Sequence, residues 1–135
     1  MKKTLLSSAL LTLVLTAAQS TQAADPVWLE GKTEQSYAIQ VYHSPTCGCC
    51  KGWVDHLKAH NFKVESIEMH DVTPVKQQFG VPPRGASCHT AVVNGKVIEG
   101  HVPAQAIKQL LSAESDIRLL TVPGMPSGGP GMDYE

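Results

Sequence analysis

Three of the four cysteines of this chain lie within four consecutive residues, in the segment 47–50, which reads Cys-Gly-Cys-Cys. The largely apolar run 38–42 before them is typical of a buried strand. After them, Cys50, Val54 and Leu57 recur at helical spacing. The cysteines are therefore expected where a strand turns into a helix. The unpaired N–H groups and the dipole at a helix start favour thiolate over thiol.

A structural disulfide framework does not explain this spacing. Cysteines that staple a fold are spread along the chain, whereas a Cys47–Cys50 bridge encloses only two residues and restricts the unfolded chain little. Cys49 and Cys50 are neighbours and can hardly pair with each other. The cluster therefore predicts nucleophilic or metal-binding thiols, with Cys47 as the more reactive member of the Cys47–Cys50 pair.

The chain begins like an exported protein. Two lysines follow Met1, an apolar stretch rich in Leu and Ala covers 4–18, and small residues lead to Ala23. This pattern predicts a secretory signal peptide over 1–23. A membrane anchor is the alternative, but the apolar run is short and is interrupted by Ser and Thr. Export implies an oxidising compartment.

The rest of the chain is long enough for one domain with a modest core. We expect an N-terminal lead-in over 24–36, a folded domain over 37–120, and a tail rich in Pro, Gly and Met over 121–135. Without the signal peptide, nine basic residues face twelve acidic ones. No basic patch indicates nucleic-acid binding, and no second segment could span a bilayer.

The hydrophobic patterns predict an α/β fold with the element order β-α-β-α-β-β-α. The expected strands are 37–42, 63–69, 90–93 and 96–99, and the expected helices are 49–60, 71–79 and one that opens at 103. The first two strands should be parallel because a helix connects them. Asn94-Gly95 between two apolar runs predicts a hairpin with a type I′ turn. Two parallel strands and a terminal hairpin, with helices on both faces, form a thioredoxin-like arrangement.

The fourth cysteine, Cys88, lies just before the expected hairpin. In thioredoxin-like folds the position five residues before Asn94 usually holds a cis-proline that lies against the Cys-x-x-Cys turn. This chain has His89 there. We therefore expect a fourth thiol and an imidazole beside Cys47, and no ordinary groove for an extended peptide.

The tail from Val122 to Met132 contains three Pro, four Gly and two Met in eleven residues, a composition that excludes a helix or a regular strand. Met125 and Met132 have no hydrophobic company in it. We expect a flexible arm whose thioethers reach the cysteine site, Met125 more surely than Met132. A disordered end is the alternative.

Ligand softness identifies the metal. Three or four thiolates with thioether or imidazole neighbours favour Cu(I), and Zn(II) is the main competitor. Adjacent Cys49 and Cys50 should point in different directions, which suits several bridged copper ions better than one tetrahedral zinc ion. His43 precedes Cys47 closely enough to line the site. The candidate ligands are Cys47, Cys49, Cys50, Cys88, His43, His89, Met125 and Met132.

The remaining histidines receive no ligand role. We expect His56, His60 and His70 to be solvated or helix-terminal, and we assign no chemistry to His101.

Four segments together resemble the periplasmic copper-resistance proteins of the CopG family. They are 47–50 with Trp53, 88–90 (Cys-His-Thr), 100–103 (Gly-His-Val-Pro) and 122–132. The resemblance covers nearly all of 37–132. It implies a thioredoxin-like fold, copper binding at the cysteine cluster, a role in copper tolerance, a periplasmic location, and other periplasmic copper-resistance proteins as partners. The segment 42–50 also resembles glutaredoxins and thioredoxins, which implies a redox role for Cys47 and Cys50.

Three functions follow from these residues. The first is a copper-binding redox protein, in which copper or the thiols change oxidation state. The second is a copper carrier or buffer without turnover. The third is a thiol–disulfide oxidoreductase that acts on proteins; the Cys47–Cys50 pair favours it, and His89 in place of the proline disfavours it.

Overall fold

The computed structural model describes residues 35–132. The predicted signal peptide and most of the predicted lead-in lie outside these residues. In chain order the elements are β1 (Tyr37–His43), α1 (Gly48–Ala59), β2 (Phe62–Glu68), α2 (Thr73–Gln78), the 3-10 turn η2 (Pro83–Gly85), β3 (Thr90–Val93), β4 (Lys96–Glu99), α3 (Ala104–Ser112) and β5 (Leu119–Thr121).

The strands form one sheet in the order β2-β1-β3-β4-β5. β1 and β2 are parallel, β3 is antiparallel to both β1 and β4, and β5 is parallel to β4. The predicted α/β class and element order are confirmed. β5 was not predicted, because three residues are too few to show a strand pattern. Its pairing with β4 makes it a strand.

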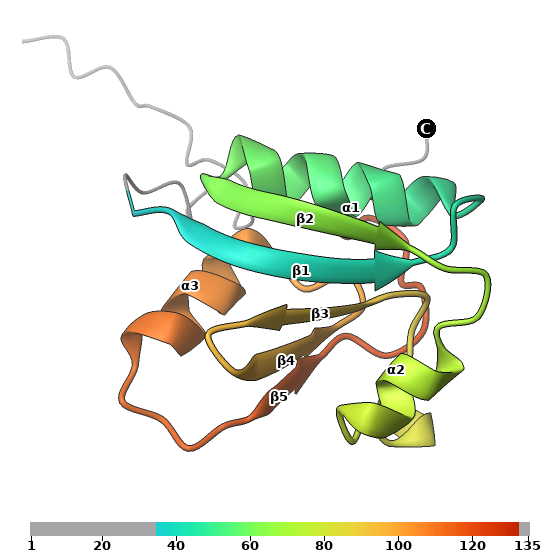
Figure 1. Cartoon of the computed structure of the whole chain (residues 1–135). Helices are drawn as coiled ribbons and strands as arrows, with labels where there is room; N and C mark the ends of the chain where they lie inside the picture. The colour runs from blue at the N-terminus through green and yellow to red at the C-terminus, as the bar shows by residue number, and fades with distance from the viewer. Residues whose placement is uncertain (1–34, 133–135) are drawn as a thin grey trace, which may run out of the picture.

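Both longer helices bury one face in a common core against the sheet, and Figure 1 shows α1 running alongside β1 and β2. The predicted stripe of Cys50, Val54 and Leu57 on α1 is buried. Trp53 lies in the same core, and its indole Nε1–H donates to Val102 O at 2.9 Å. That bond joins α1 to the segment that leads into α3.

Two turns, the second of them the predicted hairpin turn, have the backbone that their residues favour. Asn61 has φ of 64° directly after the end of α1, as expected for the residue that follows a helix. Asn94 and Gly95 have φ of 48° and 73°, which matches the two positive φ angles of a type I′ turn. This turn fixes the register of β3 and β4, in which Thr90 pairs with Glu99. Among residues 35–132, no helix has the length and apolarity needed to cross a bilayer.

The histidines of α1 are packed together. His60 ends the helix and is buried, and its ring lies 4.4 Å from that of His56 between centroids. His56 Nε2 accepts a hydrogen bond from the backbone N–H of Ala104 at 3.0 Å, which ties α1 to the first turn of α3. His70 is exposed. None of the three lies in a cysteine or metal-ligand cluster within the described part of the chain.

Candidate metal centre

The cysteine segment lies where β1 turns into α1. The backbone N–H of Cys47 donates to Ser44 O at 3.1 Å, which closes the turn. Cys47 then caps α1, and its Sγ accepts the backbone N–H of Cys50 at 3.3 Å. Ser, Thr, Asp or Asn usually fill this position. The Cys47 sulfur thus accepts a hydrogen bond from one of the unpaired N–H groups at the helix start, in the setting that the sequence pattern predicted.

All four cysteines converge, and their Sγ atoms lie within 4.8 Å of one another. Cys47 and Cys50 form a disulfide. Cys49 Sγ lies 3.4 Å from Cys47 Sγ and 3.7 Å from Cys88 Sγ. Cys50 is fully buried, whereas Cys49 and Cys88 are free thiols with partial exposure. The sulfurs thus form a chain that opens toward solvent at Cys49 and Cys88.

Cys88 belongs to a loop that β4 holds on both sides. The Ser87 backbone N–H donates to Glu99 Oε1 at 2.7 Å, and the Gly100 N–H donates to His89 O at 3.1 Å. Burial raises the pKa of the Cys88 thiol to about 11, against a hydrogen bond from Ser87, and Cys49 adds to the rise. A metal that binds Cys88 must therefore displace its proton.

His89 and His101 both face Cys88. His89 Nδ1 and His101 Nε2 each lie 3.3 Å from Cys88 Sγ. The opposite nitrogens meet carbonyls: His89 Nε2 donates to Gly100 O at 2.9 Å, and His101 Nδ1 donates to Pro130 O at 2.8 Å. Both rings are buried. The predicted approach of an imidazole to the cysteines is thus present twice.

The sequence reasoning assigned no chemistry to His101, although a signal for it was available. Thr90 pairs with Glu99 across the hairpin. The same register continued by two residues sets Cys88 opposite His101. Counting outward from the predicted turn at Asn94-Gly95 would therefore have placed His101 beside Cys88.

The other predicted ligands are more dispersed. His43 is buried, and its ring nitrogens lie 2.9 Å from Ser44 O and 2.5 Å from Ser66 Oγ, so both are engaged away from the sulfurs. Met125 is 60% exposed, whereas Met132 is buried.

The tail itself reaches the cysteine turn. Gly131 packs so closely on α1 that an added Cβ would lie 2.7 Å from Cys49 O and 2.6 Å from Trp53 N. The carbonyl of the preceding Pro130 holds His101. The tail therefore contributes backbone contacts at the site, and buried Met132 follows directly.

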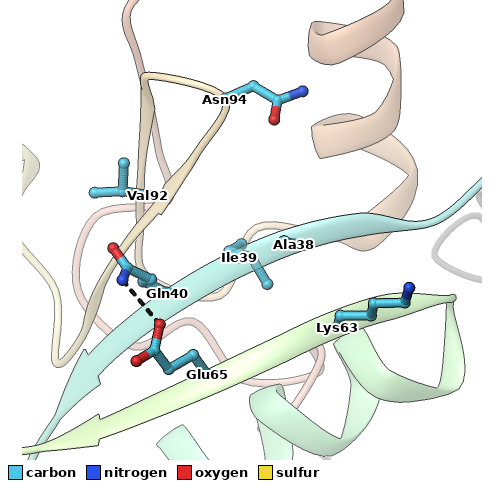
Figure 2. A pocket seen from close by; sticks show the side chains of 7 residues that line it. All are labelled: Ala38, Ile39, Gln40, Lys63, Glu65, Val92 and Asn94. Atoms are coloured by element: carbon cyan, nitrogen blue, oxygen red, sulfur yellow. Dashed lines mark hydrogen bonds between the residues drawn. The ribbon is translucent and has the colours of Figure 1, made fainter.

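Two surface hollows lie away from the four sulfurs. Figure 2 shows one of about 310 Å³ over β1, β2 and β3, in which Gln40 Nε2 donates to Glu65 Oε2 at 2.8 Å. A second, of about 280 Å³, lies beside α1 and β2 and includes His43 and Lys51. Neither is lined by cysteine, so the chemistry of this protein is not expected in these hollows.

The buried histidines predict acid sensitivity of the metal-free protein. Burial, and then the charge of His101, lower the pKa of His89 to about 3, while burial and His60 lower that of His56 to about 4. In the unfolded chain both take up a proton near pH 6.5. Below that pH the unfolded state binds more protons, so stability falls as pH falls. His89 alone accounts for on the order of 3 kcal/mol at pH 4.

Urea unfolding of the apoprotein at several pH values between 7.5 and 4 measures this effect. His56→Gln should make the free energy of unfolding less dependent on pH between 6.5 and 4, because only the contribution of His89 then remains. His70→Gln, at an exposed position, should leave the pH dependence unchanged. A wild-type profile that is flat over this range would contradict the prediction.

Comparisons with known proteins identify relatives of this chain. The family model described as "Protein of unknown function, DUF411" matches residues 85–132. A solved structure named "Copper resistance protein copG- Form 2" is 46% identical, with a TM-score of 0.71, and the match covers 74% of this chain and 80% of that one. The "Form 1" structure is also 46% identical, with a TM-score of 0.69 and coverages of 74% and 79%. No curated protein matches. Such identity over most of a solved relative, in a chain that gathers four cysteines at one turn, makes this protein a member of the family of the copper resistance protein CopG.

Proposed function

We propose that the reduced protein binds Cu(I) through Cys47, Cys49, Cys50 and Cys88. The observation that carries this proposal is the convergence of four sulfurs within 4.8 Å at one turn. Thiolates are the soft ligands that Cu(I) prefers, and one thiolate sulfur can bridge two copper ions. Four sulfurs at this spacing suit a cluster of several Cu(I) ions, with Zn(II) as the competing metal.

A redox role rests on the Cys47–Cys50 disulfide, the pair that we propose as catalytic. Its formation from two thiols releases two electrons and two protons. Two Cu(II) ions could take one electron each and become two Cu(I) ions. Cys47 and Cys50 would then be the reductant, and Cys49 and Cys88, which stay reduced, would be the soft ligands left for the Cu(I) product. Whether this reaction turns over decides between an oxidoreductase and a carrier.

Carriage without turnover is the second candidate, and the partial exposure of Cys49 and Cys88 favours it. Ligands that reach solvent can hand a metal to another protein by exchange. We propose that this occurs in the periplasm, after removal of the signal peptide, with other copper-resistance proteins as partners. Met125, Met132 and His89 remain proposed additional ligands. His43 is the weakest of the proposed ligands, because it would first have to give up its hydrogen bonds to Ser44 O and Ser66 Oγ.

The quadruple variant Cys47→Ser, Cys49→Ser, Cys50→Ser, Cys88→Ser tests the copper site. Reduced wild-type protein should take Cu(I) from a chromophoric chelator, and the variant should take none, because hydroxyls are poor Cu(I) ligands. Ser44→Ala is the matched control at the same turn and should retain the wild-type stoichiometry. Full Cu(I) uptake by the quadruple variant would refute the proposal.

A further inference from the structure

The contacts between Cys88 and the rings of His89 and His101 lack a proton for one hydrogen bond. Because a carbonyl only accepts hydrogen bonds, the nitrogens that face Gly100 O and Pro130 O must carry the ring protons. The nitrogens that face Cys88 Sγ therefore present lone pairs. One thiol proton cannot serve both nitrogens. Two imidazole lone pairs thus face one sulfur, and a cation bound between the three atoms would satisfy all of them.

The spacing of these donors is close to that of a tetrahedral metal site. With the usual zinc bond lengths, a tetrahedron requires roughly 3.6 Å between sulfur and nitrogen and roughly 3.8 Å between two sulfurs. Cys88 Sγ lies 3.3 Å from each histidine nitrogen and 3.7 Å from Cys49 Sγ. The donor atoms of Cys88, His89 and His101 lie within 4.8 Å of one another, so small side-chain movements would bring these three to one ion. Cys49 lies outside this group of three and must move toward the imidazoles to complete the tetrahedron.

The two rings are already oriented as metal ligands usually are. A ligating histidine normally donates its other N–H to a backbone carbonyl or carboxylate, which fixes its tautomer. Here both rings do so. Packing holds them as well: His89 lies 4.4 Å from the Trp53 ring and 4.7 Å from the His101 ring, between centroids. Little rotamer freedom remains to be lost on binding.

These ligands do not require Cys47 or Cys50. The disulfide occupies both of those sulfurs, which leaves Cys49 and Cys88 as free thiols. We propose that the disulfide form of the protein carries a divalent-metal site, made of Cys88 Sγ, His89 Nδ1 and His101 Nε2 and completed by Cys49 Sγ. Its two imidazoles and two thiolates form a donor set that suits Zn(II).

Whether Cys47 and Cys50 are thiols or a disulfide thus determines which metal the protein favours. In the reduced protein, four soft sulfurs favour Cu(I); in the disulfide form, two sulfurs and two nitrogens favour a divalent ion. The zinc site goes beyond the proposed copper function. It shares Cys49 and Cys88 with the copper site, but it belongs to the disulfide form and adds His101, so it can be tested without copper. An ion can enter beside Cys49 and Cys88, which are partly exposed.

Zinc titration of the disulfide form tests this inference. Peptide mapping first establishes that Cys47 and Cys50 are bridged while Cys49 and Cys88 are thiols. Competition with a chromophoric zinc chelator should then give one Zn(II) per chain. His101→Gln and His89→Gln should each weaken binding at least about tenfold, since changes even to outer-shell groups have that effect. His70→Gln, at an exposed position, is the matched control and should bind as the wild type does.

Two further measurements guard against misfolded variants. Zinc X-ray absorption on the wild-type disulfide form should show two sulfurs and two imidazoles. The double variant Cys47→Ser, Cys50→Ser should still bind one Zn(II). Failure of the disulfide form to bind zinc, or a zinc shell without imidazole, would overturn the inference. Cu(I) competition on the reduced protein is a separate arm, so loss of one metal site is distinguishable from loss of the other.

Discussion

Lys76→Met is expected to lower the free energy of unfolding by about 3–5 kcal/mol, because it leaves a buried carboxylate without its cation. Lys76 Nζ lies 2.5 Å from Glu99 Oε1, and Glu99 is fully buried. Glu99 also accepts the Thr90 hydroxyl at 2.6 Å and the Ser87 backbone N–H at 2.7 Å. Without Lys76, the Glu99 carboxylate keeps only these two hydrogen bonds from neutral donors.

The same substitution should affect the metal centre. Glu99 holds Ser87, the residue before Cys88, so a displaced carboxylate frees the loop that carries this thiol. Lys76 comes from α2, which lies beyond the carboxyl ends of β1 and β2 in Figure 1. We therefore expect weaker metal binding in Lys76→Met, although Lys76 is not itself a ligand.

Urea unfolding, in a double-mutant cycle with Glu99→Gln, measures how much the Lys76–Glu99 ion pair contributes to the free energy of unfolding. The double variant Lys76→Met, Glu99→Gln should be more stable than Lys76→Met alone, because it buries no unpaired charge. Lys63→Met, at an exposed position on β2, should change stability by less than about 0.5 kcal/mol. A Lys76→Met protein as stable as the Lys63→Met control would show that the ion pair contributes little.

Gly131→Ala is expected to detach the tail from α1. Gly131 has φ of 81°, where an alanine costs about 1–2 kcal/mol. Its Cβ would also lie 2.6 Å from Trp53 N and 2.7 Å from Cys49 O. These are backbone atoms inside a helix and cannot move aside. The tail should therefore give way, which releases the Pro130 carbonyl from His101 and exposes Met132.

Gly128→Ala is a closely matched control, since Gly128 has φ of 80° but no atom within 4 Å of an added Cβ. Amide exchange over 129–132 should accelerate more than about tenfold in Gly131→Ala and less in Gly128→Ala, because only the former loses the packing. Metal affinity should fall in the same order. Equal exchange rates in the two variants would mean that the contact with α1 does not hold the tail.

The local features of this protein could be predicted from its sequence. The strand-to-helix turn that carries 47–50, the parallel crossover and the Asn94-Gly95 hairpin each depend on neighbouring residues, so periodicity and turn chemistry were sufficient. The gathering of Cys88 with the other cysteines was implied by the resemblance to thioredoxin-like folds, in which the residues before the hairpin lie against the Cys-x-x-Cys turn. The softness of four thiols then pointed to copper before any tertiary contact was known.

Tertiary structure decided what lies around those thiols. β5 exists because β4 offers an edge with which three residues can pair, and no pattern within Leu119–Thr121 indicates it. The fixed tautomers of His89 and His101 depend on carbonyls from Gly100 and Pro130. The burial of Met132 and the exposure of Met125 depend on where the tail meets α1. A sequence pattern reports contacts between residues near in the chain, whereas these contacts join segments that only the folded sheet and helix bring together.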